Sequence, residues 1–568
     1  MILLSTLLLS IFVTMVLIPI FGRLAVKLHA LDVPDSRKVH SQPVPRTGGF
    51  AMTIGAFSSI LLWARSDSFV HAYLIGASII VFVGLVDDMK GLDYRAKFAG
   101  QIAAALLVIF VGGIKINTLG TLLPGELTLP AWFAIPFTLL VVVGVTNAIN
   151  LADGLDGLAG GICLLSLGCL GYLGYVEGDM LITLLAVALA GAIFGFLRFN
   201  TYPATVFMGD TGSQLLGFSV IVLGLHLTQG STPLSPLVVL LIVGFPVLDT
   251  TTVIMERLVQ RRPLFIADKR HLHHKLMGIG LFHNEAVFAI YVAQSFFVVA
   301  ALLFRFHSDW LLLWLYVFFS FVLVGGLALA RRKKWRLSRE GIVDRVIKGR
   351  LKVVKERLKA SRVFIRTAFA IVRIGLPLLL VVTCFLPGAV PGYLAVLCAV
   401  GGGAIALGGL LRKTWARWVI VTTLYLFIPF IVFLGETERA AWFINVWPKL
   451  YNLAYVLLAL GIILTLRWTW RKEGFRVTPM DFLILFIAVA VSLLPEAYSK
   501  QLHLGAVATR TVTLFFGYEV LIGELRGELG FVTWTTAAAL LLGRARFGRS
   551  VGTTGPPGAG LGRPSRRA

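Results

Sequence analysis

The sequence predicts an all-α fold, a polytopic bundle of transmembrane helices, and two observations lead to this prediction. Hydrophobic residues make up 57% of the 568 residues and only 14% are charged, whereas a soluble domain of this length carries about a quarter charged residues. The mean hydropathy is +0.87, and apolar residues gather in runs of roughly 17 to 23, enough to cross a ~30 Å hydrocarbon core as helices. These observations exclude a soluble globular protein.

The first 330 residues hold about eleven such runs, each long enough for one span. Residues 1–21 have no basic start and no small-residue cleavage site, so they are interpreted as a first span and not as a removed signal peptide. We expect spans near residues 1–21, 48–65, 69–86, 98–113, 130–147, 157–175, 180–197, 213–229, 234–255, 286–304 and 309–330.

The distribution of Lys and Arg predicts the orientation of these spans. The net charge of +24 comes mostly from cations in short loops, which the positive-inside rule explains without a nucleic-acid partner. The odd-numbered loops carry most of these cations, so we expect them on the cytoplasmic side, with the N-terminus outside. Four carboxylate-bearing motifs fall in loops three, five, seven and nine, so all four are expected at the cytoplasmic face.

The chain divides into four parts, of which residues 1–330 are the first membrane domain. The basic residues 331–362 carry apolar residues at helical spacing, which predicts either an amphipathic helix on the anionic inner leaflet or a solvated linker. Residues 363–543 are expected to form about six or seven more spans, and no acidic or histidine-rich motif stands out there. Residues 544–568 have the Gly, Pro, Ser and Arg content that is typical of a disordered tail.

Asp87 and Asp88 end the third expected span. Paired carboxylates can hold Mg²⁺, or one of them can act as a base whose pKa its neighbour raises. Helix capping is the alternative, but acidic groups at a membrane edge are costly unless they bind something. We therefore favour a functional role, with Lys97 nearby as a matching cation.

The most specific motif is NAINLADGLDGLAGG, residues 147–161, in which Asn147, Asn150, Asp153 and Asp156 recur at three-residue steps. The glycines among them predict a broken, loop-like segment. Such backbone is tolerated at membrane depth only where it lines a polar cavity. Asn and Asp oxygens suit Mg²⁺, which usually keeps substrate phosphates among its ligands.

Two shorter motifs precede other spans. Asp210 lies between glycines in FMGDTGS and is interpreted as a metal ligand, while Thr211 and Ser213 are candidate caps of the following helix. Arg46, in RKVHSQPVPRTGG, is a candidate phosphate contact, with simple positive-inside topology as the equal alternative.

A histidine-rich loop follows the ninth expected span. Three histidines can hold zinc, but the flanking cations favour an anion, so we expect a diphosphate-binding loop and keep zinc as the alternative. Asp249, inside the ninth span, either lines the same cavity or pairs with a nearby polar group. The residues expected to bind in this loop are Lys269, Arg270, His271, His273 and His274.

These motifs, in this order over residues 1–330, resemble the polyprenyl-phosphate N-acetylhexosamine-1-phosphate transferases of glycosyltransferase family 4. The loop after Asp268 is more similar to the undecaprenyl-phosphate GlcNAc-1-phosphate transferase type than to the phospho-MurNAc-pentapeptide transferases. One departure is Lys269, which takes the place of an Arg and replaces a bidentate fork by a point charge. The family does not usually carry an extension such as residues 331–568, so the resemblance says nothing about that part.

The resemblance implies a Mg²⁺-dependent phosphotransferase, with Mn²⁺ as an alternative ion. It would move GlcNAc-1-phosphate from UDP-GlcNAc to undecaprenyl phosphate at the cytoplasmic face of a bacterial plasma membrane, release UMP, and start a cell-envelope glycan such as O-antigen. Asn150 and Asp210 would hold the metal, and Asp87 or Asp88 would act on the lipid phosphate. The other residues expected to bind substrate are Arg46, Lys97, Asn147, Asp153, Asp156, Lys269, Arg270, His271, His273 and His274.

Several alternatives are left open at this point. Another UDP-sugar, including the MurNAc-pentapeptide precursor, would suit the same motifs, and a homodimer is an open oligomeric state. A transporter is the rival from another class, but it would place ionisable groups near the bilayer midplane and often show inverted repeats, and no repeat is visible in the sequence. A CDP-alcohol phosphotransferase would need a DGxxAR signature, which is absent.

Overall fold

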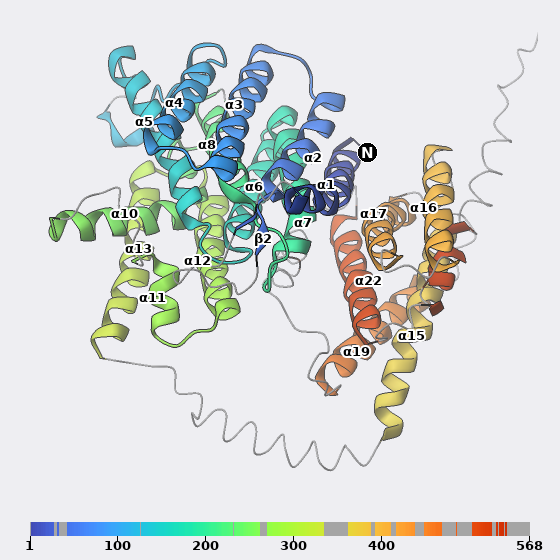
Figure 1. Ribbon diagram of the computed structural model, residues 1–568. Helices are drawn as coiled ribbons and strands as arrows, with labels where there is room; N and C mark the ends of the chain where they lie inside the picture. The colour runs from blue at the N-terminus through green and yellow to red at the C-terminus, as the bar shows by residue number, and fades with distance from the viewer. Residues whose placement is uncertain are drawn as a thin grey trace, which may run out of the picture. The chain divides into compact units, whose positions relative to one another are not determined.

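The computed structural model describes most of the chain and separates it into two compact units (Figure 1). Unit 1 comprises residues 1–345 and 477–483, and unit 2 comprises residues 346–476 and 484–568. Among the described residues, ten helices are long and apolar enough to cross a membrane, which confirms the all-α, polytopic membrane fold. The described residues are 2–27, 31–32, 43–124, 127–230, 232–261, 270–333, 362–387, 392–410, 416–437, 448–468, 484, 503–524, 530–531, 533–538 and 540–541.

Unit 1 is a helical bundle with one short pair of strands. Strands β1 (Leu31–Asp32) and β2 (Val44–Pro45) pair antiparallel, with Asp32 opposite Val44. A 3₁₀ turn, η1, covers Gly120–Leu122. The helices are α1 (Ile2–Lys27), α2 (Gly48–Trp63), α3 (Ser68–Lys90), α4 (Tyr94–Phe110), α5 (Ala131–Ala152), α6 (Leu158–Val176), α7 (Met180–Asn200), α8 (Gly209–Gln229), α9 (Val238–Ile242), α10 (Gly244–Val259), α11 (Leu272–Gly278), α12 (His283–Phe304) and α13 (Asp309–Arg332).

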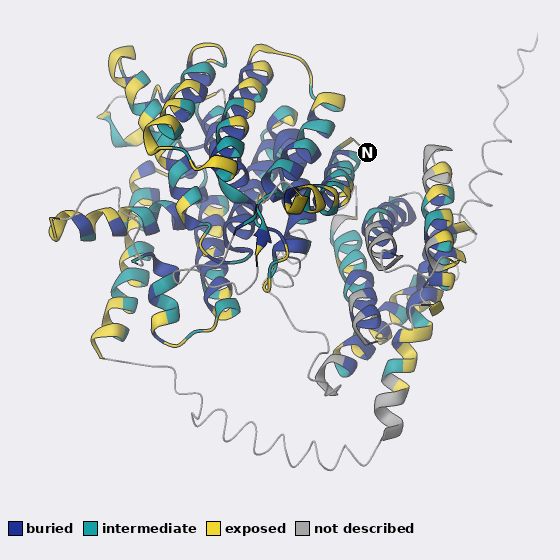
Figure 2. Cartoon of the chain, in the orientation of Figure 1, coloured by how far each residue is buried: buried dark blue, intermediate teal, exposed yellow. Residues whose placement is uncertain are grey.

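Helix α8 is the centre of unit 1. Almost every residue from Thr211 to Thr228 is buried (Figure 2), and α2, α3, α5, α6 and α7 all pack against it. Glycine permits the closest approaches near its first turn. A Cβ on Gly84 of α3 would lie 2.6 Å from Thr211 Cα, and one on Gly49 of α2 would lie 2.2 Å from Gly212 N. The first turn of α8 is therefore held directly by two neighbouring helices.

The ninth expected span, residues 234–255, is not one helix, and this expectation is corrected. The structure divides it into α9 and α10, which meet at Val243, and in Figure 1 α10 runs crosswise to α12 and α13. Pro246 lacks an N–H and disfavours helical geometry in the residue before it. The Gln294 side chain of α12 spans the break, since its Oε1 accepts from Phe245 N at 3.1 Å and its Nε2 donates to Ile242 O at 2.7 Å.

Unit 2 is a second helical bundle, in which α15, α17, α19 and α22 pack together. It contains a buried ion pair between Glu436 and Arg510, and the Arg510 guanidinium stacks 4.7 Å from the ring centre of Tyr451. Residues 334–361, most of the expected amphipathic segment, and the tail from 544 lie outside the described residues. The described helices of unit 2 are α15 (Arg362–Phe385), α16 (Gly392–Leu410), α17 (Ala416–Thr437), α19 (Pro448–Trp468) and α22 (Leu504–Glu524).

Candidate active site

Three charged side chains from three helices meet beside the start of α8. Lys97 Nζ of α4 lies 2.6 Å from Asp87 Oδ2 of α3 and 3.0 Å from Asp210 Oδ2 of α8. Asp87 is 9% exposed, while Lys97 and Asp210 remain about 30% exposed. The single ammonium thus offsets part of the repulsion between two carboxylates that lie far apart in the sequence.

Asp88 has a different environment from its neighbour Asp87. Its carboxylate accepts hydrogen bonds from Asp210 N at 2.9 Å, Thr211 N at 3.0 Å and Thr211 Oγ1 at 2.7 Å. Asp88 therefore caps α8 from a neighbouring helix. A helix is more often capped by the residue that immediately precedes its own first turn. Gly209 makes room for it, with φ of +68° and a Cβ position that would lie 2.4 Å from Asp88 Oδ2.

The candidate caps Thr211 and Ser213 do not cap α8. Thr211 donates its hydroxyl to Asp88, and Ser213 donates to Gly209 O at 3.0 Å while it accepts from Asn150 Nδ2 at 2.8 Å. The expectation that they are caps is therefore wrong, because the incoming Asp88 carboxylate already satisfies the first amides of the helix.

A chain of hydrogen-bonded side-chain amides leads from α5 to Asp210. Asn147 Nδ2 donates to Gln101 Oε1 at 2.6 Å, and Gln101 Nε2 donates to Gln214 Oε1 at 3.0 Å. Gln214 Nε2 in turn lies 3.3 Å from Asp210 Oδ2. Gln101 and Gln214 are 3% and 1% exposed, so Asn147 takes part in a connection between helices.

The motif of residues 147–161 is helical in its first part and broken in its second. Asn150 lies in the last turn of α5, which ends at Ala152, and α6 begins at Leu158. Asp156 lies in the intervening turn and accepts from Ala204 N at 2.9 Å. Gly157, with φ of +79°, is held by Asn200 Oδ1 on its N–H and by the Tyr291 hydroxyl on its carbonyl.

Asp153 follows directly after α5 and is half-buried. Burial raises the pKa of this carboxyl to about 7, and the nearby Asp210, Asp156 and Asp88 raise it in the same direction. The Arg46 guanidinium opposes this rise. Asp153 therefore gains or loses its charge near neutral pH.

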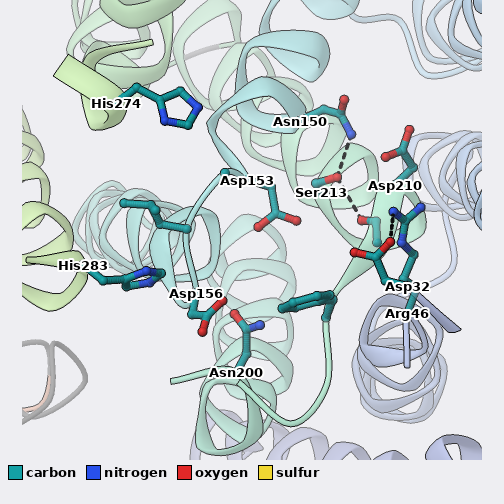
Figure 3. Close-up of a pocket in the computed structure, with 14 residues that line it drawn as sticks. Asp32, Arg46, Asn150, Asp153, Asp156, Asn200, Asp210, Ser213, His274 and His283 are labelled. Carbon is teal, nitrogen blue, oxygen red and sulfur yellow. Dashed lines mark hydrogen bonds and ion pairs between the residues drawn. The ribbon is translucent and has the colours of Figure 1, made fainter. Parts of the chain in front are cut away.

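A cavity of about 300 Å³ lies between this turn and the start of α8 (Figure 3). Figure 3 shows Asn150, Asp210 and Arg46 toward one side and Asp156 and His283 toward the other. The segment after β2 brings Arg46 there, because Phe207 N donates to Pro45 O at 2.8 Å and Arg46 Nη2 lies 2.6 Å from Asp32 Oδ1. The lining residues are Asp32, Arg46, Asn150, Asp153, Gly154, Leu155, Asp156, Asn200, Phe207, Gly209, Asp210, Ser213, His274 and His283.

Of the described residues of the histidine-rich loop, only His274 lines the cavity. His271 Nδ1 lies 2.9 Å from Asp249 Oδ2, and Asp249 Oδ1 accepts from Leu272 N at 2.6 Å. Asp249 thus pairs with a nearby polar group, which was one of its two expected roles. His273 is buried against Gly154, and burial lowers its pKa to about 3, so its ring is neutral at physiological pH.

The profile of Glycosyl transferase family 4 matches residues 70–228 of the chain. The chain is 36% identical over 317 residues to the probable undecaprenyl-phosphate N-acetylglucosaminyl 1-phosphate transferase of Bacillus subtilis (strain 168), a match that covers 56% of this chain and 87% of that protein. The chain belongs to this family.

Two further relatives are consistent with membership of Glycosyl transferase family 4. Decaprenyl-phosphate N-acetylglucosaminephosphotransferase of Mycolicibacterium smegmatis is 37% identical over 310 residues, which cover 47% of this chain and 74% of that protein. Undecaprenyl-phosphate alpha-N-acetylglucosaminyl 1-phosphate transferase of Escherichia coli (strain K12) is 29% identical over 367 residues, which cover 63% of this chain and 96% of that protein. The chain is thus a multi-pass membrane enzyme of the polyprenyl-phosphate GlcNAc-1-phosphate transferase family.

The residues expected at the site of this family 4 enzyme fall into three sets. Arg46, Asn150, Asp153, Asp156, Asp210 and His274 line the cavity. Asp87, Asp88, Lys97 and Asn147 do not line it and join it through Asp210 or its first helical turn. Arg270, His271 and His273 are described but do not line the cavity, and Lys269 lies outside the described residues.

Sequence reasoning missed several residues of the site. Gln101 and Gln214 follow Lys97 and Asp210 by four positions, so each pair shares one face of a helix. That spacing was the signal that could have found them. Asn200, Phe207 and His283 also line the cavity, but no local pattern in the sequence separates them from ordinary helix-end residues.

The described residues contain no group of three His, Cys, Asp or Glu side chains placed to hold a metal ion. A divalent cation would therefore need amide and substrate oxygens as well. Asn150 fits this need, because its amide nitrogen donates to Ser213 and its carbonyl oxygen is left as an acceptor. With one Asp210 oxygen, this gives two hard ligands, and Mg²⁺ typically completes its shell with waters and substrate phosphates.

Proposed function

We propose that this transferase moves GlcNAc-1-phosphate from UDP-GlcNAc to undecaprenyl phosphate and releases UMP. The observation that carries the proposal is the position of Asp210, which lines the cavity and also pairs with Lys97 beside Asp87. A reaction between two phosphorylated substrates needs two phosphate sites that share one reaction centre. The names of the relatives, which specify N-acetylglucosaminyl 1-phosphate and undecaprenyl or decaprenyl phosphate, support the same choice.

The donor would occupy the cavity. Asn150 and Asp210 would hold Mg²⁺ on the diphosphate of UDP-GlcNAc, where the ion supplies charge neutralisation for the leaving phosphate. His274, on another wall of the cavity, would donate a hydrogen bond to a phosphate oxygen. Asp153 and Asp156 would shape the part of the pocket that receives the nucleotide.

The acceptor phosphate would bind on the Lys97 side of Asp210. Lys97 would attract the phosphate, and Asp87 would take its proton if it arrives protonated. An oxygen of the acceptor phosphate would then attack the β-phosphorus of UDP-GlcNAc, and the bond from that phosphorus to the bridging oxygen would break to release UMP. Asp88 is the poorer candidate base, because its carboxylate accepts three hydrogen bonds from the start of α8.

The site is proposed to face the cytoplasm of a bacterial cell, and the product would start a cell-envelope glycan. Support comes from the cations that gather in the loops on the same side as the motifs. UDP-sugars are soluble anions, so a donor site at the cytoplasmic ends of the helices would be reached without crossing the bilayer.

The proposal is tested by a transfer assay on full-length protein in detergent. The reaction contains undecaprenyl phosphate, Mg²⁺ and UDP-GlcNAc labelled in the sugar, and it follows both label in the lipid phase and UMP in the aqueous phase. We expect equal amounts of the two products, and no transfer in EDTA. A well-folded protein that transfers no label would overturn the GlcNAc assignment.

Sugar specificity is tested in the same assay with competing donors. UDP-GalNAc and UDP-MurNAc-pentapeptide are supplied in turn, each at the concentration used for UDP-GlcNAc. We expect the highest kcat/KM with UDP-GlcNAc. A higher kcat/KM with either competitor would reassign the substrate while keeping the reaction class.

A further inference from the structure

Gln101 and Gln214 have no role in the proposed chemistry, yet both are buried beside it. They connect α4 to α8, since Gln101 Nε2 lies 3.0 Å from Gln214 Oε1. The chain of amides continues to Asn147 on one side and to Asp210 Oδ2 on the other. Each amide that donates to the next fixes the orientation of its own acceptor oxygen.

The direction of these bonds matters for Asp210. Gln101 donates to the Gln214 oxygen, so the Gln214 amide nitrogen is directed toward Asp210. Asp210 Oδ2 then faces two donors, Lys97 Nζ at 3.0 Å and Gln214 Nε2 at 3.3 Å. These two donors therefore hold Oδ2 on the side of α4 and α8, and they fix the orientation of a carboxylate that also lines the cavity.

We propose that Gln101 and Gln214 are positioning residues that hold the Asp210 carboxylate in the orientation needed to bind a divalent cation and to face the donor diphosphate. This inference rests on the proposed metal role of Asp210. Side chains that orient a metal ligand without touching the metal change metal affinity or activity by about 10- to 100-fold when they are removed. The simpler reading is that these amides only join helices inside a membrane protein.

The two readings are separated by a matched pair of substitutions in α8. Gln214→Met removes the donor to Asp210 while it roughly preserves side-chain volume. Gln229→Met makes the same change fifteen residues later in the same helix, about 22 Å away at 1.5 Å per residue. Gln229 also bonds to another segment, since its Oε1 accepts from Asn117 N at 2.9 Å and its Nε2 donates to Thr118 O at 3.1 Å.

The first measurement is Mn²⁺ binding, followed by the electron paramagnetic resonance signal of free Mn²⁺ in the presence of UMP. We expect the dissociation constant to rise about 10-fold in Gln214→Met and to stay within twofold of wild type in Gln229→Met. The same direction with a smaller change is expected for Gln101→Met, which lies one bond further from Asp210. Equal dissociation constants in wild type and Gln214→Met would overturn the positioning role.

The second experiment measures both kcat and the melting temperature of each variant. A purely structural role lowers the melting temperature of both Gln214→Met and Gln229→Met and leaves the kcat of folded protein similar. A positioning role lowers kcat about 10- to 100-fold in Gln214→Met alone. If the wild type itself binds no Mn²⁺, the proposed metal set fails. The kcat comparison then still decides the positioning role, which an unchanged kcat in Gln214→Met would reject.

Discussion

The Asp88 carboxylate of α3 binds Thr211 at the start of α8 through two atoms of that residue. Asp88 Oδ2 accepts from the Thr211 hydroxyl at 2.7 Å and from its backbone N–H at 3.0 Å. The first turn of α8, which carries Asp210, is thereby fixed to α3, which carries Asp87. One of the two neighbouring carboxylates anchors the site while the other faces Lys97.

This finding predicts that Asp88→Ala acts mainly on stability. Removal of a helix cap costs about 1–2 kcal/mol, and activity should fall because Asp210 loses its anchored turn. Asp88→Asn, which keeps acceptor oxygen, should recover part of the stability. The free energy of unfolding is measured by denaturant titration in mixed micelles. An inactive Asp88→Ala protein with unchanged stability would instead restore Asp88 as the base.

Lys97 should be essential for turnover. Lys97→Met leaves Asp87 and Asp210 without their shared cation, and we expect kcat to fall about 100-fold or more. Lys97→Arg keeps the charge in a different geometry and should retain part of the activity. Initial rates of UMP release at saturating UDP-GlcNAc provide the measurement. A kcat for Lys97→Met within threefold of wild type would contradict the proposed acceptor site.

The contact between α3 and α8 predicts a large difference between two glycines. Gly84→Ala places a Cβ 2.6 Å from Thr211 Cα, so we expect a loss of about 1–3 kcal/mol. Gly144→Ala, in α5, meets nothing within 4 Å and should be neutral or stabilising by up to about 1 kcal/mol. Thermal unfolding of the two variants tests this contrast. Equal melting temperatures of the two variants would contradict the close approach of α3 and α8 at Gly84.

Asp153 predicts a pH dependence of stability. Its pKa of about 7 lies above the ordinary aspartate value of 3.8, so the folded protein binds more protons than the unfolded chain between these two pH values. Stability linked to this group is therefore highest below pH 3.8, decreases as pH rises, and reaches its minimum above pH 7. In EDTA, Asp153→Asn should melt above wild type at pH 8, with a smaller difference at pH 5. A difference that is constant over this range would refute the raised pKa.

Much of the fold could be predicted because it depends on local composition. Ten of the eleven expected spans of residues 1–330 are single helices in the structure, and eight of these are long and apolar enough to cross a membrane. The exception, α9 and α10, depends on a distant residue, because Gln294 of α12 satisfies the broken backbone. The break itself was signalled by Pro246, but the side chain that stabilises it had no signal in the ninth span.

The site was less predictable, because its groups assemble across helices. The carboxylates and Asn150 stood out as polar residues in apolar surroundings, and they do gather around Asp210. The sequence could not separate Asp87 from Asp88, since their roles differ only through the position of α8. It also could not assign a role to His271, which lies just before α11 and whose partner Asp249 lies in α10.

The link that Asp210 makes between the donor cavity and the Lys97 cluster is tested by a comparison of two carboxylates, the half-buried Asp210 and the buried Asp309. Asp210 and Asp309 both lie in the first turn of a helix. Asp309 binds Thr121 and Ser235. These residues lie near the C-terminal end of α8, whereas Asp210 lies at its N-terminal end. Full-length Asp210→Asn and Asp309→Asn would be compared for kcat in the transfer assay. We predict a loss of about 100-fold or more in Asp210→Asn and near wild-type kcat in Asp309→Asn. A folded Asp210→Asn protein with near wild-type kcat would contradict the claim.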